Sequence, residues 1–334
     1  MKKGFLFGII FALFLFVGSA YADSCDMLDM FDDTYVGVGA IDMQKMPDRE
    51  IYGTLMSFFM TDPEAHKVLV DLEKSGLTSK SVRRIVVGIP ADVERAEFLM
   101  IWETMSSIKP YVPVLEKYAA SFEKKKLGNH DYYCKKDGNQ CLLMLDESLV
   151  LASQAKMNSF ILMLDNSGRT NKKNVKLKEI AQTTDQKKDA WLVFWLDEVQ
   201  RGRIGQGDPL VDMSAEGKGT LRLGSIQSGN VSLDFSKGMH ADIAIQMLEP
   251  AHAKYFSDIL TTLLERARND EDVKTLGLVD VMNGIQVGAR KNEFVVTVAY
   301  SQKTFSQLIS VVSDLVKMTA RDGLENTTAK KIQS

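Results

Sequence analysis

Two distant stretches of this chain share a pattern, and that pattern constrains the fold more than any other feature. The first reads VRRIVVGIPADVERAEFLMIWET and the second reads VMNGIQVGARKNEFVVTVAYS. In both, two apolar runs flank a polar turn, which predicts a pair of antiparallel strands. Each is followed by a segment whose apolar residues recur at helical spacing, which predicts a helix after the strands. The matched residues are Ile85, Val87, Gly88, Glu97 and Phe98 in the first stretch, and Ile285, Val287, Gly288, Glu293 and Phe294 in the second.

The likeness extends towards the start of each stretch. Residues 34–46 and 189–202 both contain an apolar strand ending in an aspartate, Asp42 or Asp197. Helical patterns at 51–60, 64–74 and 250–268 precede the matched strands, and short Gly-bearing turns elsewhere indicate antiparallel meanders. The predicted fold class is therefore α+β, with two related halves, each an antiparallel sheet backed by helices on one face. The two sheets are either separate or continuous across the repeat. The alternative is a chance recurrence of strand, turn, strand and helix.

The predicted organisation has five segments. They are a signal peptide (1–22), a first α+β half (23–165), a linker region (166–188), a second α+β half (189–320) and a flexible tail (321–334). The linker prediction depends on the polar run NSGRTNKKNVK, and the tail prediction on the polar, non-periodic sequence RDGLENTTAKKIQS.

The first residues predict export. They comprise two lysines, an apolar run from Phe5 to Val17, and the small-residue pattern Ala20-Tyr21-Ala22. The run is short for a membrane span, which needs about 20 residues, so we expect cleavage after Ala22. The short Lys-Lys start is typical of bacteria, and no later apolar run reaches membrane length. We expect a periplasmic or extracellular protein with no transmembrane segment in the mature chain.

The charge balance argues against nucleic acid as a partner. Without Lys2 and Lys3, 39 basic residues (41 minus 2) stand against 44 acidic ones. Binding to a phosphate backbone requires a clustered basic face. We therefore expect no nucleic-acid partner, and instead an unknown envelope protein or an apolar ligand.

Signatures of catalysis and metal binding are scarce. The four histidines lack HExxH and HxH spacing, and no nucleophile elbow or phosphate-binding loop occurs. They are His66, His130, His240 and His252. The strand-end residues Asp42 and Asp197 are the candidates for a catalytic acid pair, although such aspartates more commonly cap the next helix. We predict no catalytic residue, no metal site and no cofactor.

Methionine is the one unusual feature of the composition. Sixteen remain without Met1 (17 minus 1), including Met27, Met30, Met43 and Met46 at close spacing. Thioether clusters can hold Cu(I), whereas scattered methionines fill irregular cores. Because most of them stand among Leu and Phe at core-facing positions, we expect core packing.

Cys134 and Cys141 flank the polar turn KKDGNQ. The Asp-Gly pair at its centre favours a two-residue hairpin turn, which places the two cysteines opposite each other. Opposed strand residues have Cα atoms about 4.5–5.5 Å apart, within the range of a disulfide. The alternatives to a disulfide are a metal site and a redox centre. A metal site would need two more ligands, and a redox centre is expected to use the closer spacing Cys-x-x-Cys. We predict a Cys134–Cys141 disulfide, with Cys25 left free or bonded to another molecule.

These features together predict an exported bacterial envelope protein with a non-enzymatic binding or structural role. Two alternatives stay open: a carrier of an apolar ligand or soft metal ion, and an unrecognised hydrolase that uses Asp42 and Asp197.

Overall fold

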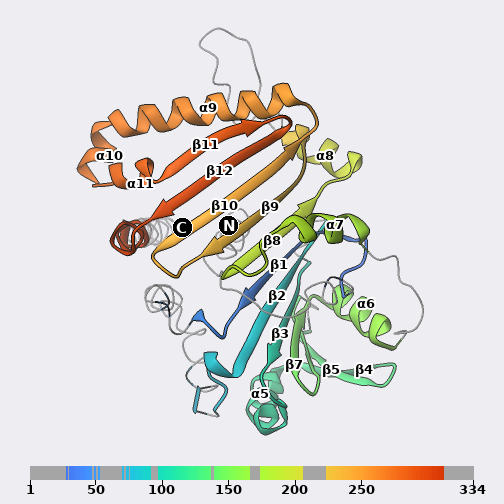
Figure 1. Cartoon of the computed structure of the whole chain (residues 1–334). Helices are drawn as coiled ribbons and strands as arrows, with labels where there is room; N and C mark the ends of the chain where they lie inside the picture. Colours follow the sequence, from blue (N-terminus) through green and yellow to red (C-terminus); the bar gives the residue numbers. More distant parts are fainter. Residues whose placement is uncertain are drawn as a thin grey trace, which may run out of the picture.

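The computed structural model describes residues 28, 30–46, 49, 52, 70, 73–74, 76–91, 97–136, 139–165, 174–205 and 223–311. Their strands form one twelve-stranded antiparallel sheet in the order β11-β12-β10-β9-β8-β1-β2-β3-β7-β6-β5-β4 (Figure 1). The protein is therefore a mixed α+β protein with a large antiparallel sheet, as predicted. The two expected sheets are joined into one because β1 pairs with β8.

The strands of the two sequence halves stay on their own sides of the sheet. The first half supplies β1 (Tyr35–Asp42), β2 (Val82–Pro90), β3 (Leu99–Thr104), β4 (Glu123–Leu127), β5 (His130–Cys134), β6 (Cys141–Met144) and β7 (Ser148–Ala152). The second half supplies β8 (Ala190–Trp195), β9 (Ile226–Asp234), β10 (Met239–Met247), β11 (Ile285–Arg290) and β12 (Glu293–Tyr300).

Helices connect these strands and pack on the sheet. They are α5 (Val112–Tyr118), α6 (Gln154–Asp165), α7 (Val175–Thr183), α8 (Glu198–Gly205), α9 (Pro250–Asn269), α10 (Glu271–Thr275) and α11 (Val279–Asn283), and residues 302–311 are also helical. The amphipathic pattern predicted at 250–268 is therefore confirmed as α9. None of the helices in the described part of the chain is both long and apolar enough to cross a membrane.

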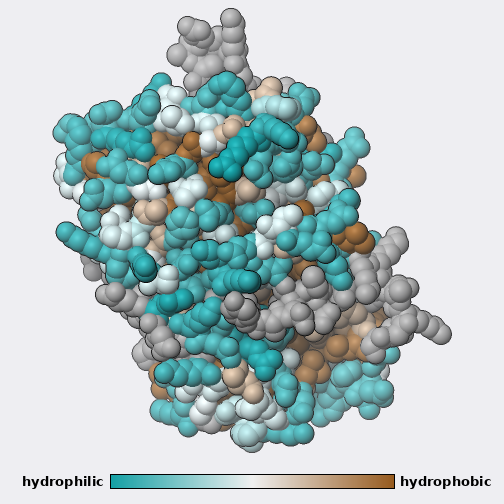
Figure 2. Space-filling model, in the orientation of Figure 1, coloured by the Kyte–Doolittle hydropathy of each residue, from teal (hydrophilic) through white to brown (hydrophobic). Residues whose placement is uncertain are grey.

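The two sides of the sheet are covered differently. In the first half, one face packs against α6 and α7 and the other packs against α5. The expectation of helices on one face is therefore wrong for this half, because its strands carry apolar side chains on both faces. In the second half, α9, α11 and residues 302–311 cover one face. Figure 2 shows the second half as mainly hydrophilic in this view, with hydrophobic residues in a band just below α9.

The strands matched in the sequence do not hold equivalent positions. β2 contains Ile85 and pairs with β1 and β3 inside the sheet, whereas β11 contains Ile285, pairs with β12 and forms an edge. The alignment of Ile85 with Ile285 is therefore wrong: apolar strand pairs recur in any antiparallel meander, and five identities did not distinguish one pair from another.

Part of the predicted linker, 166–188, is helix α7. Asn174 caps it, since the Asn174 side chain accepts a hydrogen bond from Leu177 N at 3.2 Å. Leu177 and Ala181 are buried in the first-half core. Residues 175–183 of the predicted linker region are thus helical, and Lys176, Lys178 and Glu179 stand among the apolar residues of this short helix. The predicted signal peptide (1–22), the helical patterns at 51–60 and 64–74 (apart from a few of their residues) and the tail (321–334) lie outside the described residues.

The Cys134–Cys141 disulfide is present. The two residues are direct partners in the β5–β6 ladder, with Cα atoms 4.0 Å apart. Lys135 N donates to Gln140 O at 2.9 Å, which is the register that the hairpin pattern predicts. Both cysteines are fully buried in the core under α6. Cys25 and the two turn residues 137–138 lie outside the described residues.

Candidate functional site

A cavity of about 230 Å³ lies where the two halves of the sheet meet. It is bounded by the start of β1, the N-terminus of α7 and the connection from β8 to α8. The lining residues are Asp33, Tyr35, Asn174, Val175, Lys176, Trp195, Asp197 and Gln200. Pockets for whole drug-sized ligands measure about 300–1,000 Å³, so this cavity suits a smaller group.

Asn174 forms the wall on the side of α7. Its Oδ1 accepts the hydrogen bond from Leu177 N, and its Nδ2 donates to Tyr35 O at 2.7 Å and to Asp32 O at 3.3 Å. Asn174 is buried, so one side chain both caps α7 and ties it to the strand entering the sheet. The position of α7 against β1 is fixed at the cavity wall.

Asp197 and Gln200 form the wall on the side of α8. Gln200 N donates to Asp197 Oδ1 at 2.7 Å, and Asp197 N donates to Gln200 Oε1 at 2.7 Å. This reciprocal pair is a capping box at the N-terminus of α8. The helix-capping role that the sequence favoured for Asp197 is therefore confirmed, and the same carboxylate lines the cavity.

Tyr35 closes the cavity towards the core. Its ring lies edge-on to Phe31, with centroids 5.1 Å apart, and Lys156 Nζ lies 4.8 Å from the Tyr35 centroid. Lys156 also contacts Thr34 Oγ1 at 3.0 Å and Glu97 at 3.3 Å. Burial, and then the nearby negative charges of Asp32 and Glu97, raise the pKa of the Tyr35 hydroxyl far above its ordinary value, so it stays neutral.

Trp195, at the end of β8, lines the cavity and also packs against the first-half core. It is half-buried, whereas Trp102 and Trp191 have indole nitrogens that are buried without a hydrogen-bond partner in the described structure. Two valines at the first turns of α7 and α8 are exposed: Val175, which lines the cavity, at 57% and Val199 at 63%. The cavity thus has polar walls, two aromatic residues (Tyr35 and Trp195) and the exposed apolar residue Val175 in its lining.

The other strand-end acid, Asp42, lies far from this cavity. Ile41 faces Ala190 in the β1–β8 ladder and Gly37 faces Phe194, so Asp42 and Asp197 lie at opposite ends of antiparallel neighbours. The separation is on the order of 20 Å, given about 3.3 Å per strand residue. The two acids cannot act on one substrate bond, so they do not form a catalytic pair.

Asp42 belongs instead to a buried row of charges across three strands. It lies opposite Arg84 on β2, which lies opposite Glu103 on β3. Arg84 Nε donates to Glu103 Oε2 at 3.0 Å, and Arg84 Nη2 contacts the same oxygen. Asp42 and Arg84 are both buried, and the Arg84–Glu103 ion pair is a structural contact within the sheet.

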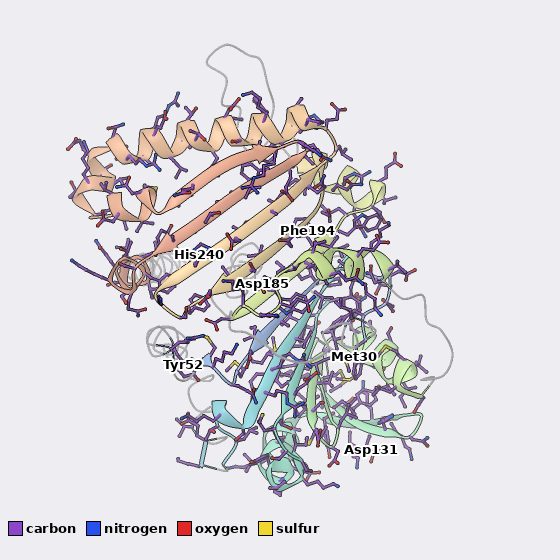
Figure 3. The ribbon with its side chains drawn as sticks, in the orientation of Figure 1. Met30, Tyr52, Asp131, Asp185, Phe194 and His240 are labelled. Carbon is purple, nitrogen blue, oxygen red and sulfur yellow. A yellow bond between two sulfur atoms is a disulfide. The ribbon has the colours of Figure 1, made fainter. Side chains whose placement is uncertain are left out.

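The four closely spaced methionines are divided between different cores. Met30, labelled in Figure 3 within the first half, packs against the core under α6 and α7. Met43 packs with β1 and β2 on the opposite face, and Met46 lies in the core of the second half. Met27 lies outside the described residues. The three that are described are placed as core residues.

The histidines of the described residues are also dispersed. His130 lies 3.3 Å from Asp165, His240 lies 3.2 Å from Asp242, and His252 lies on α9. No group of three or more His, Cys, Asp or Glu side chains with metal-binding geometry occurs in the part of the chain that the structure describes. His66 lies outside that part.

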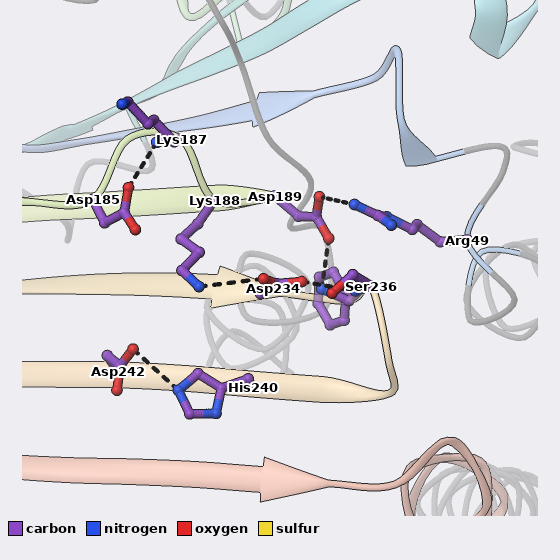
Figure 4. A network of polar contacts seen from close by, with 10 residues as sticks. Arg49, Asp185, Lys187, Lys188, Asp189, Asp234, Ser236, His240 and Asp242 are labelled. Atoms are coloured by element: carbon purple, nitrogen blue, oxygen red, sulfur yellow. Dashed lines mark hydrogen bonds and ion pairs between the residues drawn. The ribbon is translucent and has the colours of Figure 1, made fainter.

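A second polar network joins the start of β8 to the β9–β10 hairpin (Figure 4). The buried Asp189 accepts hydrogen bonds from Arg49 Nη2 at 2.8 Å and from Phe235 N at 2.5 Å. Lys188 Nζ contacts Asp234 Oδ2 at 3.2 Å, and Ser236 N donates to Asp234 Oδ1 at 2.8 Å. These contacts fix the hairpin, and they lie at the opposite end of β8 from the cavity.

The Asp234 contacts predict a pH-dependent contribution to stability. Burial alone would raise the pKa of the Asp234 carboxyl, but hydrogen bonds from Ser236 and the ion pair with Lys188 outweigh burial and lower it to about 2. The unfolded chain has an ordinary pKa of 3.8. The ionised carboxylate therefore stabilises the fold above that value, and this stabilisation is lost as the pH falls from about 4 to about 2.

We expect Asp234→Asn to lower the free energy of unfolding by about 1 kcal/mol at pH 7, a figure reduced for partial solvent exposure. Urea denaturation across pH 2–7 measures the difference from the wild type. The difference should shrink towards zero near pH 2. Asp258→Asn, at an exposed ion pair on α9, is the control and should change little at any pH. A difference that is independent of pH would contradict the assignment.

Comparisons with known proteins identify a distant structural likeness. No protein-family model matches the chain, and no curated protein matches its sequence. Solved structures of TP0453 are similar. Crystal form III has a TM-score of 0.49 and 9% identity, covering 86% of this chain and 97% of its own. Crystal form I has a TM-score of 0.47 and 11% identity, covering 89% and 98%. At this level neither fold details nor function are transferred to this chain.

Several cavity residues were not identified from the sequence. Asn174 lay inside the predicted linker, although Leu177, Ile180 and Ala181 follow it at helical spacing, and that spacing was a usable signal. Tyr35 and Trp195 are apolar strand residues like many others in the chain. Tyr35 and Trp195 lie near Asp197 only because β1 pairs with β8, and no local sequence pattern specifies that pairing.

Proposed function

We propose that this is an exported envelope protein with a non-enzymatic binding role, and that a partner polypeptide binds at the mouth of the cavity between α7 and α8. The observation that carries the proposal is the cavity itself. Its lining combines the half-buried Trp195, polar walls and the exposed Val175, and the exposed Val199 stands directly before the lining residue Gln200 in the chain. Aromatic residues that anchor a contact, surrounded by residues that exclude water, are typical of binding hot spots.

The geometry supports this role better than the alternatives. A hydrolase that uses Asp42 and Asp197 is disfavoured because the two residues lie at opposite ends of β1 and β8. A carrier of an apolar ligand would need a larger and mainly apolar pocket, whereas Asp33, Asp197 and Asn174 line this one. A carrier of soft metal through the clustered methionines is disfavoured because Met30 and Met43 pack on different faces of the sheet.

A site-specific cross-linking experiment tests the proposal. A photoreactive phenylalanine analogue replaces the exposed Val199, which directly precedes the lining residue Gln200 on α8, and in a matched control it replaces Asp258 on α9. Irradiation of intact cells should give an adduct of one defined mass at position 199 and none at position 258, with the partner identified by mass spectrometry of the adduct. The same adduct at both positions, or none at position 199, would refute binding at the cavity. Fractionation of the same cells tests export.

We also infer that the two halves descend from a duplicated unit, although with a different equivalence from the one in the sequence. From the central pair outwards, the order β1-β2-β3-β7-β6 matches the order β8-β9-β10-β12-β11. A helix follows the third strand in both halves, α5 in one and α9 in the other. The helices after β7 and β12 cover opposite faces, so the resemblance is partial. Sequence profiles of each half should align β2 with β9, and an alignment of β2 with β11 would contradict this equivalence.

A further inference from the structure

We propose that two copies of this protein pair through the edge strand β11, so that their sheets become continuous. In the part of the chain that the structure describes, β11 pairs with β12 alone and forms the outer edge of the sheet beside α9 (Figure 1). The features that carry the proposal are the direction of the β11 backbone groups, the lack of protection at this edge and the self-complementary sequence of the strand. None of its residues lines the cavity, so the proposal is independent of the proposed binding role.

The backbone of β11 presents alternate residues to the outside of the sheet. Directly before the strand, Ala299 N donates to Gly284 O at 2.8 Å. Antiparallel neighbours exchange such bonds at every second residue, so in the β11–β12 register the residues between them turn their N–H and C=O groups away from β12. These residues are Ile285, Val287 and Ala289. Arg268 Nη2 on α9 donates to Ile285 O at 3.3 Å, which agrees with an outward carbonyl.

The two edges of the sheet differ in their protection against pairing. Lysines on an edge strand oppose pairing with another chain, and β4, at the other edge, carries Lys124, Lys125 and Lys126. Because Lys135 N donates to Gln140 O, the alternation through β5 turns the backbone of Lys124 and Lys126 outward on β4. In contrast, β11 reads IQVGAR, without lysine or proline, and its ladder with β12 has no register shift. The edge at β11 is therefore the one that is open to pairing.

A second copy of β11 fits this edge. A two-fold axis at Val287 makes the two strands antiparallel and brings Val287 opposite its own copy, so that all the outward backbone groups find partners. The other facing pairs put a longer side chain opposite a small one: Ile285 with Ala289, and Gln286 with Gly288. Arg290, the one charged residue of β11, falls beyond the paired run, so no like charges face each other.

A second copy is also a better occupant than a flexible segment of another protein. β11 is already ordered by its hairpin with β12 and by packing under α9, so two such strands meet with little further loss of conformational entropy. A flexible segment would lose entropy at every residue that it orders. In addition, Ile285 and Val287 are only partly buried in the second-half core, and the two-fold arrangement would cover them with the same residues of the second copy.

Self-association of the purified protein tests the inference. Sedimentation equilibrium should show a monomer–dimer equilibrium over an about hundredfold range of concentration, because mass action raises the dimer fraction. Val287→Cys, in a Cys25→Ser background, should form an intermolecular disulfide under mild oxidation, since facing residues have Cα atoms about 5.5 Å apart. Lys126→Cys at the β4 edge, in the same background, should stay without one.

Edge variants locate the interface. The Ala289 N–H points away from β12, so Ala289→Pro keeps the β11–β12 ladder and removes a donor at the edge. We expect this variant to weaken dimerisation about tenfold or more. Ala289→Lys introduces the kind of residue that protects β4 and should act in the same direction without constraining the backbone. Lys126→Pro makes the matched change at the β4 edge and should leave dimerisation unchanged.

The remaining outcomes contradict the inference. A monomer at every concentration would overturn it, as would a dimer that persists in both Ala289 variants or one that Lys126→Pro weakens equally. Far-UV circular dichroism and urea denaturation show whether each variant is folded. If Ala289→Pro does not fold, the result for Ala289→Lys decides.

Discussion

Arg84→Met should lower the free energy of unfolding by about 3–5 kcal/mol, because it leaves the carboxylate of Glu103 in the sheet without the cation that is paired with it. Arg84 is buried and lies between Asp42 and Glu103 in the cross-strand register. Equilibrium urea denaturation measures the change. Such a loss is a large fraction of the stability of most domains, which is about 5–15 kcal/mol.

Two further variants keep this prediction testable. Lys254→Met removes the same kind of group from the exposed Lys254–Asp258 pair on α9 and should cost less than about 1 kcal/mol. The double variant Arg84→Met/Glu103→Met removes both partners of the buried pair, so it should be more stable than Arg84→Met alone. If Arg84→Met costs no more than Lys254→Met, the buried row does not contribute to stability.

Gly88→Ala should lower the free energy of unfolding by about 1–3 kcal/mol through overpacking. A Cβ at Gly88 would lie 2.5 Å from Phe31 Cε1 and 2.7 Å from Tyr35 Cδ1. Both rings are buried and lie edge-on to each other, so they cannot withdraw without moving the segment that carries them. Urea denaturation measures the loss, and hydrogen exchange should show reduced protection at the start of β1, beside the cavity.

Gly288→Ala is the matched control, because Gly288 is the residue that the sequence pattern pairs with Gly88. A Cβ at Gly288 would meet nothing within 4 Å. Replacement of a strand glycine by alanine in open space reduces the entropy lost on folding, so stability should stay unchanged or rise by about 0.5–1 kcal/mol. Equal losses at both glycines would show that packing against Phe31 and Tyr35 does not distinguish them.

These two glycines also show how much of the fold the local sequence pattern could predict. Alternating apolar residues identified β2 and β11 as strands, since the two-residue period is a property of each segment alone. Their places in the sheet differ because pairing partners are chosen by long-range contacts. The same limit applies to Asp42 and Asp197: both end strands, but the antiparallel pairing of β1 with β8 sends them to opposite ends.

The sequence by itself determined the local structure of this protein: the α+β composition, the strands of the meanders, the amphipathic helix α9 and the Cys134–Cys141 hairpin. Each depends on residues close together in the chain. Only the tertiary structure decided that twelve strands form one sheet, that β1 and β8 are central, and that Tyr35, Asn174, Trp195 and Asp197 meet around a cavity. The physical reason is that the deciding contacts, β1 with β8 and Tyr35 with Asn174, join residues more than a hundred positions apart. Such contacts are selected by the burial of many side chains together and not by the conformational preference of any one segment.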